Sequence, residues 1–595
     1  MNGTTPPVAG TERLGDYSTD RRVLLLSVGA AILGILGALV AAALLWLINV
    51  ITNIAYFARF SSAPVTPADN VLGAASILIP VAGGLIIGAM ARWGSPKIRG
   101  HGIPEALEAI LIGRSRLDAK VAILKPVSSA VSIGTGGPFG AEGPIIMTGG
   151  ALGSLFAQLF HLSAAERKTL LVAGAAAGMS AVFATPIGAT LLAVELLLFE
   201  WKPRSFIPVA TAAIVASAAR VPLLGAGPIF AVHPHGPMST GSLVSALVVG
   251  VAAGFGSGLL TALVYGCEDL YQKLPIHWMW WPALGGLCVG VGGLVDPRVL
   301  GVGYGTIHSL LAGDVPPKAA ASLAVTKSLV WALALGSGTS GGVLAPLLMM
   351  GGALGALGSS VLPNGDPGLW ASIGMAAVMG GTMRSPLTAM FFAAELTHDW
   401  NLLPGLLVAC VAAYAVTVLL MRRSILTEKV ARRGHHVFRE YSVDPFHIHR
   451  VGEVMDRSVP TVPTGMSVRE LARLVAGADP ALARRQGTPI VDARGNLVGI
   501  VTRSDLMRAL DQDPTGALPV LDAGSRRPIV AHEDELIVEA VERMLAHDIG
   551  RLPVVSRENP THLVGYLGRS GIVAARQRLY EDERVRERGP RPVTS

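Results

Sequence analysis

Long apolar runs alternate with short glycine- and proline-containing breaks over the first 430 residues, and the pattern changes after that point. Apolar stretches recur at about 23–54, 71–91, 119–133, 144–160, 169–198, 205–219, 242–266, 281–295, 319–335, 343–361, 370–397 and 402–421. A helix needs ~20 apolar residues to cross a bilayer, but several stretches are shorter and broken, as at Gly134–Pro144 and Gly336–Pro346. Broken helices persist in lipid only where the freed backbone is buried in protein or lines a cavity, so these breaks indicate a solute site.

The chain after about residue 451 has a different periodicity, with short β-rich runs between amphipathic helices. It contains two similar copies, each predicted as helix, strand, helix, two strands, helix. Charge follows the same division, because 43 of the 89 charged residues lie in 1–430 and 46 lie in 431–595. We therefore expect an all-α multi-pass membrane body followed by an α/β tail. The expected segments are a polar tail 1–20, a membrane domain 21–430 with halves about 21–220 and 241–425, a linker 431–450, tail domains 451–512 and 513–580, and a charged end 581–595.

Composition excludes several classes of protein. With 51% hydrophobic and 15% charged residues, the 595-residue chain is too apolar for a disordered protein. Its three cysteines are scattered in apolar stretches, which excludes a disulfide scaffold. The net charge of +7 is not gathered in a basic arm, so nucleic-acid binding has no support. The apolar run from Val23 to Ile54 is too long for a signal-peptide core and is predicted to be the first span.

The membrane body is an internal duplication. Segments 134–155 and 336–357, read at an offset of 202, are identical at 11 of 22 positions, and Lys125 aligns with Lys327 at the same offset. Further along, Glu195 aligns with Glu395 at an offset of 200. Repeat halves place a transporter's site at their interface, near the bilayer midplane.

The glycine-rich breaks have the chemistry of a weak anion site. Helix N-termini carry about half a positive charge and unpaired N–H donors. Three such starts are predicted, after Gly100–Glu105, Gly140–Pro144 and Gly341–Pro346, with almost no basic side chains near them. Such a site stabilises a dehydrated anion and still releases it. A phosphate-binding loop is excluded because no Lys-Ser/Thr pair follows the glycines.

These three segments, GHGIPE, GAEGP and GGVLAP, resemble in order and spacing the anion-site signatures of the CLC chloride channels and chloride/proton antiporters. The resemblance covers about residues 20–430 and implies a homodimer whose subunits each have a pore built from two inverted halves. It implies that Glu142 is the gating glutamate, with helix capping as the alternative role. The anion-binding residues it implies are Gly100, His101, Gly102, Ile103, Pro104, Gly140, Ala141, Gly143, Pro144, Gly341, Gly342, Val343, Leu344, Ala345, Pro346 and Leu426.

Three positions depart from the family pattern. His101 stands where the family has a serine that donates to chloride; its imidazole either donates instead or packs neutrally against the loop. Leu426 stands where a tyrosine hydroxyl is usual, which predicts a looser central site. Leu196 replaces the internal proton-passing glutamate, and an alkyl group carries no protons. Glu195 and Glu200 are candidate substitutes in a proton path, with surface helix-end carboxylates as the preferred interpretation.

The tail resembles a tandem pair of CBS domains, which often bind adenine nucleotides (ATP, ADP or AMP). The first copy keeps Gly499–Asp505, in which Thr502 is the implied phosphate contact and Asp505 the implied ribose contact. The second copy, Gly565–Gly571, has lost both side chains. A purely structural pair is the alternative, and no other cofactor and no metal is expected, since the paired histidines are interpreted as loop residues.

The leading hypothesis is a chloride-conducting membrane protein, passive and channel-like, gated by Glu142 and regulated by the CBS pair. Chloride/proton antiport is the alternative on the same fold. A CBS-based nucleotide sensor with the membrane body as an anchor is the alternative from another class. An enzyme has least support, because no nucleophile–base pair stands among the spans. Arginines at 21–22, 422–423 and 432–433 place both termini in the cytoplasm of a bacterial inner or plasma membrane.

Overall fold

The computed structural model describes residues 21–113, 115–362, 366–435, 446, 449–483 and 485–573. The chain divides into two compact units near residue 437. The expected polar tail 1–20 and charged end 581–595 lie outside the described residues, as does most of the expected linker.

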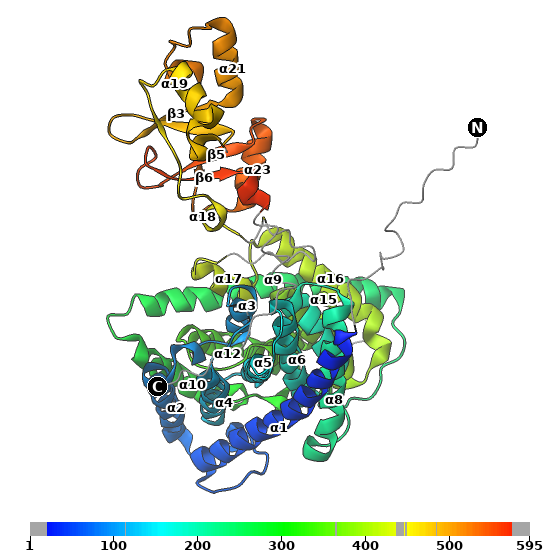
Figure 1. Ribbon diagram of the computed structural model, residues 1–595. Helices are drawn as coiled ribbons and strands as arrows, with labels where there is room; N and C mark the ends of the chain where they lie inside the picture. The colour runs from blue at the N-terminus through cyan, green and yellow to red at the C-terminus, as the bar shows by residue number, and fades with distance from the viewer. Residues whose placement is uncertain are drawn as a thin grey trace, which may run out of the picture. The chain divides into compact units, whose positions relative to one another are not determined.

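The first half of the membrane unit is a series of helices that begins with the longest one, α1 (Figure 1). These helices are α1 (Arg22–Phe57), α2 (Leu78–Ala89), α3 (Ile103–Leu111), α4 (Ala119–Gly134), α5 (Glu142–Gln158), α6 (Ala164–Phe183), α7 (Pro186–Leu192) and α8 (Pro203–Leu224). A π-helical stretch, η6 (Ala193–Leu198), continues α7. Prolines at the start of α7 and α8 suit the first turn of a helix, where no N–H partner is needed.

The second half repeats this order helix for helix. Its members are α9 (Thr240–Gln272), α10 (Trp281–Val295), α11 (Tyr304–Leu311), α12 (Pro317–Gly336), α13 (Leu344–Gly358), α14 (Pro367–Met383), α15 (Pro386–Thr397) and α16 (Leu403–Leu420), followed by α17 (Ile425–Arg432). Even the chain reversals correspond, because Ala184 after α6 and Arg384 after α14 both have a left-handed backbone, with φ of 57° and 56°. The duplication predicted from sequence is therefore also a duplication of structure.

Helices of two lengths make up this unit. Among the described residues, seven helical stretches are long and apolar enough to cross a membrane. They are Arg22–Phe57, Gly73–Gly94, Pro203–Leu224, Thr240–Gln272, Trp278–Val295, Pro317–Gly336 and Trp400–Arg432. Between them lie shorter apolar helices such as Leu344–Gly358. The described part of this unit has no strand, only isolated bridges between loops, so the expected all-α membrane fold with broken helices is confirmed.

Glycines let the central helices pack unusually closely. A side chain at Gly149 on α5 would collide with the carbonyl oxygen of Gly174 on α6, and one at Gly351 on α13 would collide with that of Gly374 on α14. Each collision is with backbone, which cannot move aside. The repeated GGALG segments are thus positions of helix–helix contact, as their sequence indicated, and they hold the starts of α5 and α13 in place.

The second unit contains two small α/β repeats. The first has α18 (Val451–Val454), β1 (Val462–Pro463), α19 (Val468–Arg473), α20 (Pro480–Ala483), β2 (Gly487–Val491), β3 (Leu497–Thr502) and α21 (Arg503–Gln512). The second has α22 (Val520–Ala523), β4 (Ala531–His532), α23 (Ile537–Ala546), β5 (Arg551–Val555) and β6 (Leu563–Gly568). In both, the first strand pairs parallel to the second, and the second pairs antiparallel to the third. The predicted α/β tail of two like copies is confirmed.

Candidate functional site

The three glycine-rich loops predicted from sequence meet at one place in the membrane unit. Gly140 and Gly342 exchange backbone hydrogen bonds of 3.4 and 2.9 Å, and the N–H of Gly341 lies 3.5 Å from the carbonyl oxygen of Gly100. A side chain at Gly143 would collide with the carbonyl oxygen of His101. The loops therefore join the starts of α3, α5 and α13. Every predicted anion-site residue in 100–104, 140–144 and 341–346 is buried.

The carboxylate of Glu142 lies at the centre of this junction. The side chain is 0% exposed, and its Oε1 accepts a hydrogen bond from the backbone N–H of Leu344. A side chain at Gly140 or Gly342 would collide with the carboxylate. Oε2 has no hydrogen-bond partner among the described residues. The carboxylate thus occupies a backbone-lined position at the start of α13 where a small anion would meet the same donors.

Two buried lysines hold the loops, and sequence reasoning gave them no role. Lys125 Nζ donates to the carbonyl oxygens of Ile98 and Gly100, at 2.7 Å each. Lys327 Nζ donates to those of Val299 and Gly301, at 2.8 and 3.3 Å. Both side chains are 0% exposed. The alignment of the two lysines in the repeat was the available signal, because a buried ammonium needs several acceptors.

The surroundings of His101 differ from the expectation of an almost charge-free path. Lys429 Nζ and Glu105 Oε1 both lie close to Gly100, and Arg433 pairs with Glu105 at 2.7 Å. The N–H of Gly102, with φ of 88°, donates to Glu105 Oε2 at 3.0 Å. The start of α3 therefore has a carboxylate cap from its own first turn, whereas the carboxylate at the start of α13 comes from Glu142 of α5. The Nδ1 atom of the buried His101 ring has no partner among the described residues.

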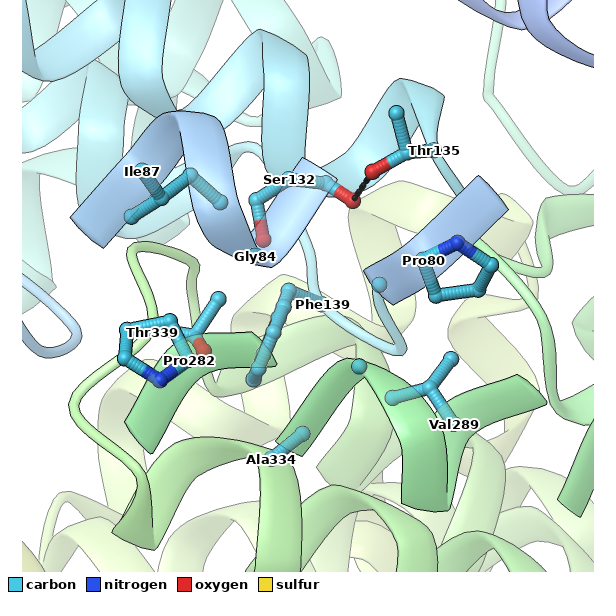
Figure 2. Close-up of a pocket in the computed structure, with 12 residues that line it drawn as sticks. Pro80, Gly84, Ile87, Ser132, Thr135, Phe139, Pro282, Val289, Ala334 and Thr339 are labelled. Carbon is cyan, nitrogen blue, oxygen red and sulfur yellow. Dashed lines mark hydrogen bonds between the residues drawn. The ribbon is translucent and has the colours of Figure 1, made fainter. Parts of the chain in front are cut away.

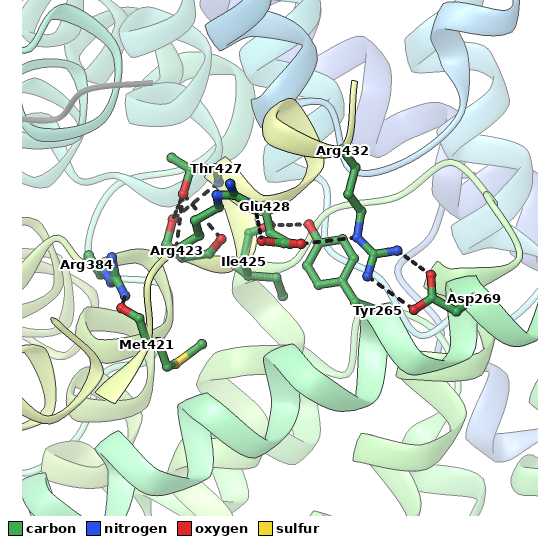
Figure 3. A network of polar contacts seen from close by, with 10 residues as sticks. Tyr265, Asp269, Arg384, Met421, Arg423, Ile425, Thr427, Glu428 and Arg432 are labelled. Carbon is green, nitrogen blue, oxygen red and sulfur yellow. Dashed lines mark hydrogen bonds and ion pairs between the residues drawn. The ribbon is translucent and has the colours of Figure 1, made fainter. Parts of the chain in front are cut away.

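Helix α17 carries the predicted site residue Leu426 and is joined to α9 by polar contacts (Figure 3). Leu426, its second residue, is buried, and the preceding Ile425 carbonyl accepts the hydroxyl of Tyr265 on α9 at 2.5 Å. A tyrosine hydroxyl is thus close to Leu426, but it comes from another helix and its proton is already donated. At the far end of α17, Arg432 contacts Asp269 and Glu428. These contacts fix α17 against α9.

The carboxylates considered for a proton path are helix caps. Glu195 accepts hydrogen bonds from the N–H groups of Leu387 and Thr388 and from the Thr388 hydroxyl, at 3.3, 2.8 and 2.6 Å. Glu395 accepts reciprocally from the N–H groups at the start of α7, at 3.0 and 2.7 Å. The interpretation as helix-end carboxylates holds for Glu195, but the expected surface position is wrong, since this residue is only 8% exposed.

Two further residues of the expected proton path have ordinary surroundings. Leu196 is fully buried in apolar packing. Glu200 forms ion pairs with Lys202 and Arg204, at 3.4 and 3.9 Å. Leu196 itself cannot ionise, and the carboxylate of Glu200 is paired with basic side chains.

A small cavity lies behind the loop that carries Gly140 (Figure 2). Its volume of about 10 Å³ is close to the space that one water molecule needs. Phe139 forms one wall, and Ser132, whose hydroxyl has no partner among the described residues, faces it from α4. The glycine-rich loop is therefore not tightly packed on the side where Gly137 and Phe139 line the cavity.

The predicted nucleotide residues of the tail serve a local purpose. The N–H and hydroxyl of Thr502 both donate to Asp505 Oδ2, at 2.9 and 2.7 Å, and the N–H of Asp505 donates back to the Thr502 hydroxyl. Asp505 Oδ1 lies 3.4 Å from Arg508. Together they form the N-cap of α21. Both bonds from Thr502 reach Oδ2, and the role of these two residues as adenine-nucleotide contacts stays a prediction.

The paired histidines of the sequence are separated by the structure into different settings. His235 Nδ1 lies 2.5 Å from Asp399, and its Nε2 lies 3.2 Å from Asp366. His449 pairs with Glu453 at 2.7 Å. His436 and His447 lie outside the described residues. Among the described residues no group of three His, Cys, Asp or Glu side chains is arranged to hold a metal ion.

Comparison with known proteins agrees with this geometry. Residues 83–418 match the voltage gated chloride channel family, and residues 451–512 and 520–578 match CBS domains. The chain is similar to the voltage-gated ClC-type chloride channel ClcB of Salmonella typhimurium, with 29% identity over 421 residues. The aligned region covers 69% of this chain and 99% of that protein. Its fold is similar to that of a slow cyanobacterial Cl⁻/H⁺ antiporter (22% identity, TM-score 0.62, 70% of this chain and 99% of that one).

A eukaryotic CLC transporter structure is similar over more of the chain, 92% of this one and 98% of that one, with 19% identity and a TM-score of 0.60. The family match covers more than half of the chain, and it contains all three loops that meet at Glu142. The chain therefore belongs to the CLC family of chloride channels and transporters, as a multi-pass membrane protein with tandem CBS domains.

Proposed function

We propose that the membrane unit conducts chloride passively along a path through the meeting point of α3, α5 and α13, and that Glu142 is its gate. The observation that carries the proposal is the position of the Glu142 carboxylate, which binds the Leu344 N–H between Gly140 and Gly342. A carboxylate and a chloride ion compete for the same donors there. When Glu142 is protonated or displaced, chloride takes its place and passes.

The donors for the anion are the backbone groups of the three loops. The N–H groups of Ala141 and Gly143 donate from the first half, and those of Val343 to Ala345 donate from the second. Gly140 and Gly342 donate to each other, and Pro144 and Pro346 have no N–H, so these four residues shape the site without donating to the anion. His101, whose Nδ1 has no partner among the residues that the structure describes, donates to the ion further along the path, and Leu426 provides an apolar contact with that ion. Lys125, Lys429 and Arg433 provide a positive potential there, which Glu105 partly offsets.

Passive conduction is supported by the surroundings of Leu196. Its alkyl side chain replaces an ionisable group, and the neighbouring Glu195 uses its carboxylate to cap α15. Neither side chain as the structure describes it offers a proton an obvious station, since Leu196 cannot ionise and Glu195 is engaged as a cap. Chloride/proton antiport is the second candidate, favoured by the similarity in fold to a cyanobacterial Cl⁻/H⁺ antiporter.

The assembled protein is proposed to be a homodimer in a bacterial inner or plasma membrane. The N-terminus and the CBS pair face the cytoplasm, in keeping with the arginines beside the first and last spans. The CBS pair regulates the transport of chloride. We place the membrane domain at about residues 21–430 and the two CBS domains at 451–512 and 513–580.

Reconstituted vesicles test the proposal directly. Chloride efflux and proton movement are recorded together after a chloride gradient is imposed. We expect chloride efflux without uphill proton movement, and faster efflux for Glu142→Gln. Uphill proton uptake driven by chloride would replace the passive proposal with antiport. Absence of any anion flux, in the wild type and in Glu142→Gln alike, would remove the transport proposal itself.

A further inference from the structure

Helix α11 is the counterpart of α3 in the second half of the membrane unit. Gly102 before α3 and Gly303 before α11 both have positive φ, of 88° and 79°. A side chain at Gly102 would collide with Met147 of α5, and one at Gly303 would collide with Met349 of α13, the residue equivalent to Met147 in the repeat. The two helix starts are therefore built alike and packed alike.

The start of α11 is joined to the glycine-rich loop that leads to Glu142. The N–H of Gly301 donates to the carbonyl oxygen of Gly136 in that loop, at 3.0 Å. In α3 the first turn contains the capping carboxylate of Glu105, whereas α11 has no acidic residue in its first turn and no side-chain cap at Gly303. A helix start favours negative charge beside it. The start of α11 is therefore suited to a carboxylate that comes from elsewhere in the chain.

Tyr304, the first residue of α11, brings a hydroxyl to this position. The hydroxyl oxygen is buried and has no hydrogen-bond partner within the described part of the chain. It is close enough to the Glu142 carboxylate for the two groups to interact electrostatically. Glu142 Oε2 is also buried without a partner there. Because an unpartnered buried polar atom is costly, this donor and this acceptor indicate a contact that forms in another position of the Glu142 side chain.

The ring of Tyr304 is held in an aromatic cluster. Its centroid lies 6.3 Å from that of Phe183 at the end of α6 and 5.7 Å from that of Phe230, with both pairs edge to face. Phe183 packs in turn against Phe392 of α15, with 5.1 Å between the ring centroids. All three phenylalanines are buried, and their rings offer a carboxylate no N–H or O–H donor. Among these four side chains, the donor is the Tyr304 hydroxyl, and the cluster fixes its position.

We propose that the Tyr304 hydroxyl donates to the Glu142 carboxylate after chloride has displaced that carboxylate from the start of α13, and so stabilises the open gate. The carboxylate moves as an anion from the Leu344 N–H to the hydroxyl, and no proton is transferred. Tyr304 is thus a positioning residue that acts on chloride through Glu142. The inference rests on the proposed gating role of Glu142 and adds a position for its carboxylate in the open state.

A double-mutant cycle tests this inference. Chloride affinity of the full-length protein in detergent is measured by calorimetry for the wild type, Tyr304→Phe, Glu142→Ala and the double variant. Tyr304→Phe removes the hydroxyl and keeps the ring. With Glu142 present, we expect it to weaken chloride binding about tenfold, because the displaced carboxylate loses a charge-assisted hydrogen bond. In the Glu142→Ala background it should leave chloride affinity unchanged, and chloride efflux from vesicles should follow the same pattern.

The control is Tyr271→Phe, which removes the hydroxyl of another buried tyrosine, on α9, and should leave chloride affinity unchanged. The unfolding temperature of Tyr304→Phe should match that of the wild type, since the hydroxyl has no partner to lose in the closed state. Equal weakening with and without Glu142 would assign the hydroxyl to chloride itself and overturn the inference, as would unchanged affinity in Tyr304→Phe. If no variant bound chloride, Glu142→Ala included, the proposed function would fail and the inference with it.

Discussion

The starts of α5 and α13 occupy the same position in the two halves of the membrane unit, yet they carry different chemistry. Glu142 and Leu344 are equivalent in the repeat, and the carboxylate of the first accepts the backbone N–H of the second. Elsewhere the halves match. Lys125 and Lys327 both donate to loop carbonyls. Glu195 caps the start of α15, and Glu395 caps the start of α7. These lysines and capping carboxylates are shared by both halves and build the frame, whereas the gate position differs between the halves, with Glu142 in the first and Leu344 in the second.

Loss of a frame lysine should have the largest effect. Lys125→Met removes a donor from the carbonyls of Ile98 and Gly100, and Lys327→Met removes one from those of Val299 and Gly301. Each buried group left unsatisfied costs about 1–3 kcal/mol. We expect both variants to lower the unfolding temperature in detergent by similar amounts and to lose chloride flux. Lys120→Met, an exposed lysine on the same helix as Lys125, is the control and should leave both properties unchanged. If only one of the two lysine variants had a lower unfolding temperature, the two lysines would not contribute equally to stability.

Removal of the gate carboxylate should have the next largest effect, on chloride flux and its pH dependence. The equivalent substitution in the second half should not have this effect. A hydrogen bond to a charged group contributes about 1.5–3 kcal/mol, which corresponds to roughly a 10–100-fold change in the ratio of closed to open sites. Glu142→Ala should therefore raise chloride flux and abolish its dependence on pH in vesicle assays. Leu344→Ala keeps the backbone N–H, so its flux should still respond to pH. A pH response that survives in Glu142→Ala would assign the gate to another group.

The two capping carboxylates, Glu195 and Glu395, should contribute equally to the stability of the membrane unit. Glu195→Gln and Glu395→Gln each weaken one buried helix cap, with an expected loss of about 1–2 kcal/mol in stability. Their unfolding temperatures should fall together, and proton movement in vesicles should be the same for both. If Glu195→Gln alone changes proton movement, then Glu195 has a transport role that its symmetry partner lacks.

The smallest effect is expected at His101, because its replacement His101→Ser exchanges one donor for another. We expect a change of about threefold in the preference between chloride and nitrate, measured by competing efflux, since a neutral hydrogen bond contributes about 0.5–1.5 kcal/mol. Val302→Ser, at the equivalent loop position of the second half, should leave anion preference unchanged. An equal change in both variants would mean that His101 acts through packing and not as a donor.

Much of this architecture could be predicted from sequence because glycine and proline mark it locally. The duplication, the three loops and the two CBS copies all follow from spacing along the chain. Contacts between distant residues could not be predicted in the same way. The cap that Glu105 places on α3, its ion pair with Arg433, and the Tyr265 hydroxyl on Ile425 join residues that share no local pattern. The arginines taken as topology signals are also partly paired with acidic residues, as Arg22 is with Glu166 at 2.7 Å.

The reciprocal caps bear on how such a chain could arise. Glu195 completes a helix of the second half and Glu395 completes a helix of the first, so neither half is finished alone. Two identical copies could exchange these caps equally well, but they would bring either two carboxylates or none to the junction that Glu142 occupies. Fusion of the copies into one gene lets selection change position 142 without changing position 344. A single negative charge at the junction of two like halves requires that the halves differ in sequence, as they do at Glu142 and Leu344.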